Sequence, residues 1–157
     1  MSDGRARTDK IVNLDRYGSP VLKWSRARDA LVTGSPSPSV TFFLGTVGPE
    51  GTPHAAGVGG LCQDGRLYFT SSPRMRKARD LAANPRCTIS ARLPDIDLIL
   101  EGEATRVTDA PTLERIVGQF REGGWPARST GWWRCARRPT WLSDSCRDNA
   151  GGFLSSS

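Results

Sequence analysis

Histidine is nearly missing from this chain, since His54 is the single histidine among 157 residues. A zinc site built on several histidines is therefore excluded, and no Ser-His-Asp triad or Cys-His nucleophile pair is evident. Cysteine is also scarce, and its four positions follow no zinc-binding spacing: Cys62, Cys87, Cys135 and Cys146. We expect no metal, and we expect Cys62 and Cys87 to be small core residues in strands.

Long apolar runs are absent as well. No stretch approaches the roughly 20 apolar residues of a membrane span, and the N-terminus lacks the apolar core of a signal peptide. These features predict a cytoplasmic protein with no membrane partner. The length predicts one domain. The net charge of +6 permits a polyanionic partner, but no nucleic-acid-binding motif accompanies it, so a phosphate-bearing small ligand is the simpler expectation.

The most informative segment covers residues 65–86. Leu67 to Thr70 has the apolar and aromatic character of a strand. Ser72-Pro73 has the residue types typical of a helix start, and Asn84-Pro85 ends the helix. Between them apolar residues recur at helical spacing: Met75, Ala78, Leu81 and Ala82. The segment therefore predicts a strand, a serine turn and a short basic helix.

Several polar groups gather at the predicted start of this basic helix. They are the hydroxyls of Thr70, Ser71 and Ser72 and the cations Arg74, Arg76 and Lys77. Cations beside a helix N-terminus are unfavourable unless an anion lies between them. The residues alone leave two interpretations equally open, which are a bound phosphate and a solvated basic helix face.

The remaining pattern predicts a mostly antiparallel β-rich fold. The elements expected are a helix between Pro20 and Val32, strands over 40–47, 53–61, 87–91 and 98–107, and a helix over 113–120 capped by Asp109 and ended by Gly123-Gly124. We expect Gly102 to mark a bulge, and Glu101 and Glu103 to share one strand face that is solvated or ion-paired with neighbouring arginines rather than used for acid–base chemistry. The small residues of 53–61 suit either a tight bend or the close approach of a flat ligand.

The order of these motifs resembles that of the pyridoxamine 5'-phosphate oxidase-like family. The resemblance rests on Tyr68-Phe69-Thr70, the short turn, Arg76-Lys77-Ala78 and Asn84-Pro85, and extends over residues 14–127. It implies an antiparallel split β-barrel of about six strands with two or three flanking helices. It also implies a homodimer that holds flavin mononucleotide (FMN) between its subunits. In that family the Arg-Lys pair binds the FMN phosphate, a role that falls here on Arg76 and Lys77.

The resemblance and the residues together give a set of candidate cofactor-binding positions: His54, Phe69, Thr70, Ser71, Ser72, Arg76 and Lys77. His54 follows Pro53, as in many resembling proteins, although a lone histidine is more often a half-buried strand residue with a local hydrogen bond. No catalytic side chain is identified, because a bound flavin would itself supply the hydride chemistry. The expected function is FMN-dependent oxidation or reduction of a small molecule. A deazaflavin-dependent reductase and a non-enzymatic flavin- or haem-binding protein are the alternatives.

The chain departs from the family pattern in two places. The strand over 53–61 lacks the family's Arg and Lys, and no histidine follows His54, so pyridoxine phosphate oxidation is not expected. Three segments are therefore predicted: a flexible tail over 1–13, the flavin-binding domain over 14–128 and an atypical tail over 129–157. That last segment, rich in Trp, Cys and Arg, suggests either divergence or a shifted reading frame. A Tyr-Arg strand in another frame of the DNA would support the shift, and its absence would exclude it.

Overall fold

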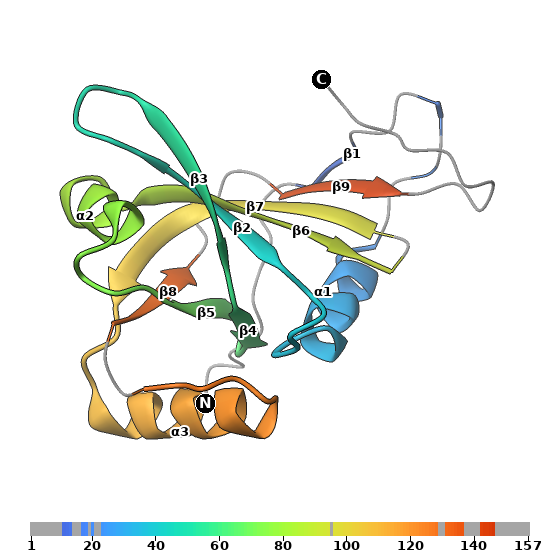
Figure 1. The fold of residues 1–157 in the computed structure, drawn as a ribbon. Coiled ribbons are helices and arrows are strands. Elements are labelled where there is room, and N and C mark those ends of the chain that lie inside the picture. Colours follow the sequence, from blue (N-terminus) through green and yellow to red (C-terminus); the bar gives the residue numbers. More distant parts are fainter. Residues whose placement is uncertain are drawn as a thin grey trace, which may run out of the picture.

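The computed structural model describes residues 11–13, 17–18, 20, 23–94, 96–128, 131–136 and 142–146. Three helices lie among the strands of the described chain (Figure 1). In chain order the elements are β1 (Ile11–Asn13), α1 (Trp24–Thr33), β2 (Phe42–Val47), β3 (Pro53–Val58), β4 (Gly60–Gln63), β5 (Arg66–Thr70), α2 (Arg76–Ala83), β6 (Arg86–Leu93), β7 (Ile96–Arg106), α3 (Ala110–Glu122), β8 (Trp132–Ala136) and β9 (Leu142–Cys146).

Seven strands follow one another in a sheet of order β3-β2-β6-β7-β8-β5-β4, and each neighbouring pair is antiparallel. The long strand β7 organises this sheet. It pairs with β6 over its N-terminal eight residues on one side, and with β9 and then β8 on the other. The path does not close into a ring, so the predicted fold class, a mainly β split barrel with flanking helices, is confirmed. Beyond that path, β1 pairs in parallel with β9.

The single strand predicted over 53–61 is wrong in one respect, because the chain changes partners at Gly59. Before it, β3 forms the predicted hairpin with β2; after it, β4 pairs with β5 at the opposite end of the sheet. Adjacent residues therefore belong to the two ends of the strand order, which bends the sheet toward closure. A Cβ at Gly60 would lie 2.6 Å from the ring of Phe42, so glycine is required at this bend.

The interior is divided into two cores, because successive side chains of a strand point to opposite faces of the sheet. Leu67 and Phe69 of β5 enter the main core within the sheet, whereas Tyr68 enters a second core beneath α3. In the same way, Trp133 joins the main core and Trp132 the second. Opposite faces of a strand therefore serve different cores, as a period of two requires.

The helices cover different sides of the sheet (Figure 1). On α1, Ala27 and Leu31 are buried in the main core. On α3 the predicted cap is confirmed, since Asp109 accepts a hydrogen bond of 3.2 Å from the Thr112 N–H. This bond holds the pKa of Asp109 below its ordinary value. None of the helices in the described ranges has the length and apolar character needed to cross a membrane.

Two further expectations change in the structure. The pairing of β6 with β7 runs without a break through Cys87 and Gly102, so the bulge predicted at Gly102 is wrong. Beyond Ser129, β8 lies between β5 and β7, and β9 also joins β7. The described parts of residues 129–157 thus continue the sheet. Residues 1–10 of the predicted N-terminal tail and residues 129–130, 137–141 and 147–157 of the predicted C-terminal tail lie outside the described residues.

Candidate cofactor site

The basic helix α2 begins at Arg76, so the start predicted at Ser72-Pro73 is wrong. The intervening residues form a turn in which the Met75 N–H donates to the Ser72 carbonyl at 3.0 Å. The Ser72 hydroxyl is within 3.4 Å of the Arg74 N–H and accepts from it. Because Ser72 bonds inside this turn, the N-cap position falls on Met75, whose side chain makes no cap hydrogen bond.

The first turn of α2 therefore combines uncapped backbone with positive charge. It contains no acidic residue, and the side chains of Arg74 and Arg76 are exposed while that of Lys77 is half-buried. A helix N-terminus carries a partial positive charge, which like charges oppose and an anion offsets. The position thus has the donor chemistry of a phosphate site.

A buried carboxylate lies one turn further along the helix. Asp80 is 4% exposed; it accepts a hydrogen bond of 2.9 Å from the Thr46 hydroxyl and lies 3.7 Å from Arg76 Nε. Thr46 is itself buried on β2. This chain of contacts connects the first turn of α2 to the sheet.

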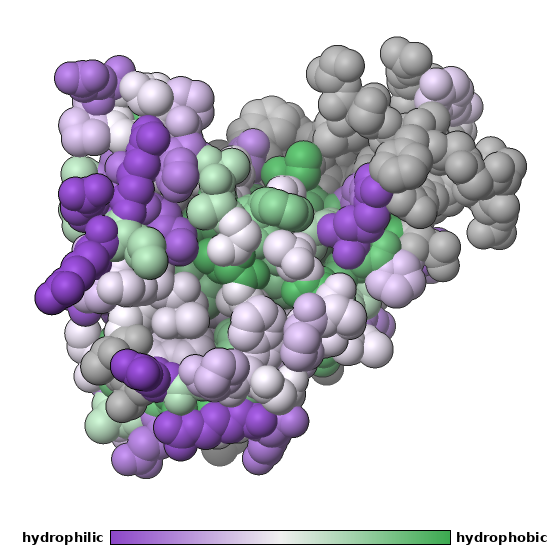
Figure 2. Space-filling model, viewed as in Figure 1, coloured by the Kyte–Doolittle hydropathy of each residue, from purple (hydrophilic) through white to green (hydrophobic). Residues whose placement is uncertain are grey.

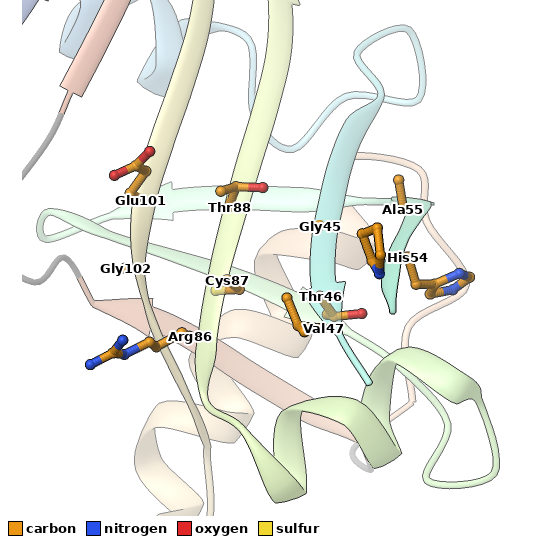
Figure 3. Close-up of a pocket in the computed structure, with 11 residues that line it drawn as sticks. Gly45, Thr46, Val47, His54, Ala55, Arg86, Cys87, Thr88, Glu101 and Gly102 are labelled. Carbon is orange, nitrogen blue, oxygen red and sulfur yellow. The ribbon is translucent and has the colours of Figure 1, made fainter. Parts of the chain in front are cut away.

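A groove of about 810 Å³ opens on the sheet beside Thr46 (Figure 3). In that view, Arg86 and Glu101 project from β6 and β7 at one side of the groove and His54 from β3 at the other. Figure 2 shows hydrophobic residues gathered in the centre of the view, between hydrophilic surfaces over α2 and α3. The lining residues are Gly45, Thr46, Val47, Pro53, His54, Ala55, Arg86, Cys87, Thr88, Glu101 and Gly102.

Small side chains make part of this groove flat. Ala55, Gly45 and Thr88 are register partners on β3, β2 and β6, and Glu101 continues the row on β7. A Cβ at Gly45 would collide with Thr88 Oγ1 unless that hydroxyl rotated away, so this row is closely packed. A wide, shallow and mostly apolar surface of this kind suits a planar ligand.

The predicted site residues do not all lie together. Of the seven, only His54 lines the groove, while Arg76 and Lys77 lie on the neighbouring helix. The Phe69 ring is fully buried in the main core, so its contribution to a site would be packing.

The serine turn is fixed largely by its own backbone. Ser71 is buried; its N–H donates to the Gly131 carbonyl at 2.8 Å, and its hydroxyl donates to the Ser72 carbonyl at 3.4 Å. The Thr70 hydroxyl, 3.5 Å from the Gly131 carbonyl, is only weakly engaged. Thr70 and Ser72 remain exposed at the end of β5.

The residues that connect the groove to α2 were not predicted from the sequence. Thr46 carries a weak signal, since it is polar at an inward position of a strand whose other inward residues are Phe42 and Leu44. Asp80 lies four residues after Arg76, the spacing of a helix ion pair, on the face that buries Ala78 and Leu81. Neither signal identifies the bond between Thr46 and Asp80, which joins positions 34 residues apart.

Two thiols meet beneath the groove. The sulfur atoms of Cys87 and Cys135 are 3.7 Å apart, although β7 separates their strands. The hydrogen bond with Cys135 and burial raise the pKa of the Cys87 thiol well above its ordinary range.

Within the described ranges, no group of three His, Cys, Asp or Glu side chains could hold a metal ion. The predicted burial of Cys87 is confirmed, and Cys62 packs against the same core.

Known proteins are similar to this chain in sequence and in fold. A family model described as "Pyridoxamine 5'-phosphate oxidase" matches residues 33–131. A pyridoxine/pyridoxamine 5'-phosphate oxidase of Anaeromyxobacter dehalogenans (strain 2CP-C) is 32% identical over 115 residues, which cover 68% of this chain and 58% of that protein. The chain therefore matches less than two thirds of its relative's length.

Two solved structures share the fold. A conserved hypothetical protein, Rv2991, of Mycobacterium tuberculosis aligns with a TM-score of 0.69 at 19% identity, covering 91% of this chain and 96% of its own. A structure named F420 reductase aligns with a TM-score of 0.56 at 24% identity, covering 73% of this chain and 94% of its own. The family match covers most of the barrel, from the end of α1 to the residue before β8. The chain thus belongs to the pyridoxamine 5'-phosphate oxidase family.

Proposed function

We propose that the protein binds FMN and uses it to oxidise or reduce a small molecule. The observation that carries this proposal is the uncapped, acid-free first turn of α2, which bears Arg76 and Lys77 and whose Arg76 guanidinium lies near Gly48, directly after the lining residue Val47. Family membership supports the same cofactor. The substrate and the direction of the reaction are to be found by screening.

The described residues fit such a ligand in two parts. The groove volume lies within the roughly 300–1,000 Å³ typical of ligand sites, and its glycine and alanine floor accepts a flat ring. Arg76, Lys77 and the exposed hydroxyls of Thr70 and Ser72 would bind the phosphate, with Ser71 and Phe69 fixing the turn and strand behind them. His54 would contact the ring or the substrate from β3. A bound flavin supplies hydride transfer, and the protein supplies binding, orientation and exclusion of water.

A second copy of the chain would complete the site. Phe43 and Val47 project from the outward face of β2 beside the groove, with 52% and 36% of their surface exposed. Exposed apolar residues around a groove favour coverage by another protein surface. We propose a homodimer with the cofactor at its interface and no nucleic-acid or membrane partner. Sedimentation of the FMN-loaded protein as a monomer would contradict this assembly.

A deazaflavin-dependent reductase is the second candidate. It is favoured by the shared fold with the structure named F420 reductase. The same basic helix and flat groove would serve a phosphate-bearing deazaflavin. Binding of flavin or haem without turnover is a further alternative, which the same experiment separates.

The test is an absorbance spectrum of the purified protein, followed by titration with FMN, riboflavin, coenzyme F420 and haem. The proposal expects a flavin spectrum or saturable FMN binding, with FMN bound more tightly than riboflavin because riboflavin lacks the phosphate. Reduction of bound FMN by NADH or NADPH, followed by reoxidation by a screened substrate, distinguishes an enzyme from a storage protein. Tight binding of F420 or haem with none of FMN would overturn the proposal.

A further inference from the structure

The buried carboxylate of Asp80 has a role that the family resemblance does not assign. A charged group removed from water is strongly destabilising unless other groups bind it. Asp80 is 4% exposed and lies on the apolar face of α2, beside the buried residues Ala78 and Leu81. An apolar residue at this position would dock the helix without a buried charge. The contacts of Asp80 therefore indicate what the charge is for.

Those contacts join the groove to the basic helix. One carboxylate oxygen accepts from Thr46, a buried residue of the groove wall, at 2.9 Å. The same oxygen lies 3.7 Å from Arg76 Nε, so it faces the inner edge of the guanidinium. Thr46 fixes the carboxylate, and the carboxylate faces the arginine.

The far edge of this guanidinium is available to a ligand. The Arg76 side chain is 45% exposed, and no other acceptor for it is found among the described residues. A Cβ placed at Gly48 would lie 3.8 Å from Arg76 Nη2 and 3.6 Å from the Asp80 carboxylate. The guanidinium thus lies beside the backbone at the end of β2, where a longer side chain at position 48 would crowd it.

We infer that Asp80, held by Thr46, is a positioning residue that orients the Arg76 guanidinium toward the phosphate of the bound cofactor. This inference rests on the proposed function. Arginine binds phosphate well through two N–H groups in a fixed plane, and a carboxylate that attracts the Nε edge leaves the Nη groups for the phosphate. Replacing an ion pair that has a buried partner by apolar residues often costs no stability, so the pair is weak evidence for a stabilising role, and orientation of the guanidinium is the consequence we assign to the contact.

Asp80→Asn separates positioning from simple electrostatics. The asparagine keeps an oxygen that accepts from Thr46 but loses the charge that attracts Arg76. Removing a negative charge near a phosphate would by itself strengthen FMN binding. The inference expects the opposite, a loss of roughly tenfold in FMN affinity, as for one charge-assisted hydrogen bond, with riboflavin affinity unchanged.

The experiment measures dissociation constants for FMN and riboflavin by fluorescence at one salt concentration. Asp29→Asn is the matched control, because it removes the same charge from an exposed ion pair on α1. In an Arg76→Ala background, Asp80→Asn should no longer change the ratio of the two affinities. Arg76→Lys, which keeps the charge but lacks Nε, should lose FMN selectivity even if the Asp80 variant fails to fold.

Equal or tighter FMN binding by Asp80→Asn would overturn the inference and leave the proposed function standing. Equal loss of FMN and riboflavin would do the same, since it would indicate a purely structural role. Retained selectivity in Arg76→Lys would also overturn the inference. Absence of FMN binding by the unaltered protein would overturn the proposed function together with the inference.

Discussion

Helices α2 and α3 pack against the same sheet but are built on different principles. At α3, Asp109 caps a first turn that itself contains no cation, and the buried residues are all apolar: Ile116, Val117 and Phe120. At α2 no side chain caps the first turn, cations surround it, and the buried face includes Asp80. The start and the buried face of α3 both favour a stable helix, whereas α2 departs from that pattern in the same two places.

The difference indicates which helix serves a ligand. Proteins depart from the local rules of stability mainly at functional sites, where a bound group compensates. In α2 the missing cap, the cations and the buried charge all occur within two turns of one another and beside the groove. We therefore expect α3 substitutions to change stability and α2 substitutions to change binding, and the four predictions below test that division.

The largest effect is expected for Phe120→Ala on α3. The ring is 1% exposed and packs against Trp132 at 4.7 Å between centroids. Truncating a buried phenylalanine typically lowers the free energy of unfolding by about 3–5 kcal/mol. Urea unfolding should report this loss, while the FMN dissociation constant of the folded fraction stays unchanged. Val32→Ala, at an exposed position of α1, is the control.

The next largest effect is on binding. Replacing Arg76 and Lys77 with alanine should weaken FMN binding about 100-fold, roughly tenfold for each charge-assisted hydrogen bond. Riboflavin affinity should change little, whereas thermal stability should fall, because removing Arg76 leaves the buried Asp80 carboxylate without the cation that faces it. Arg79→Ala removes an exposed cation from the same helix as a control. An equal loss in that control would indicate diffuse attraction rather than a site.

Giving α2 the cap that α3 possesses should stabilise it at the expense of its ligand. Met75 occupies the N-cap position with extended backbone and is 53% exposed, so Met75→Asp can bond the first-turn N–H groups. We expect a gain of about 1 kcal/mol in the free energy of unfolding together with weaker FMN binding. Met75→Ser caps without charge and separates the two causes. Tighter FMN binding by the aspartate variant would contradict an anion site.

The smallest effect concerns the cap of α3 and depends on pH. The hydrogen bond from Thr112 lowers the pKa of Asp109 in the folded protein, so its stabilisation is present above the unfolded pKa of about 4. It is lost as the pH falls through the lower folded pKa. Asp109→Ala should therefore lower Tm at pH 7 and should differ less from the parent at acidic pH. Asp109→Asn, which keeps an acceptor, should show a smaller deficit at pH 7.

The fold was predictable where short-range patterns decide it. The stripe of α3, its cap at Asp109 and the hairpin of β2 and β3 all follow from spacing and turn residues, and the structure confirms them. The exchange of partners at Gly59 was not predictable, because strand pairing depends on distant segments and a two-glycine sequence suits both a bend and a ligand contact. The start of α2 was misplaced since Ser72 bonds within its own turn.

The residue types of the candidate cofactor site were predictable from the sequence, but their arrangement in space was not. The motif placed Arg76 and Lys77 on the correct helix, next to a strand poor in bulky residues. It could not show that Thr46, from a hairpin 34 residues earlier, meets Asp80, because only tertiary packing brings them together. Nor could it show that Phe69 is fully buried while Arg86 lines the groove.

The Cys87 and Cys135 pair can report local unfolding of the sheet around β7. Both side chains are buried on strands that flank β7, and a thiol whose pKa is raised reacts slowly with alkylating agents. Their labelling by iodoacetamide would therefore be limited by how often β6 or β8 separates from β7. A ligand seated in the groove, whose lining includes Cys87, would slow that labelling in proportion to its occupancy. The alkylation rate of these two native cysteines thus reports local unfolding of the sheet, and peptide mass spectrometry can measure it without an introduced cysteine.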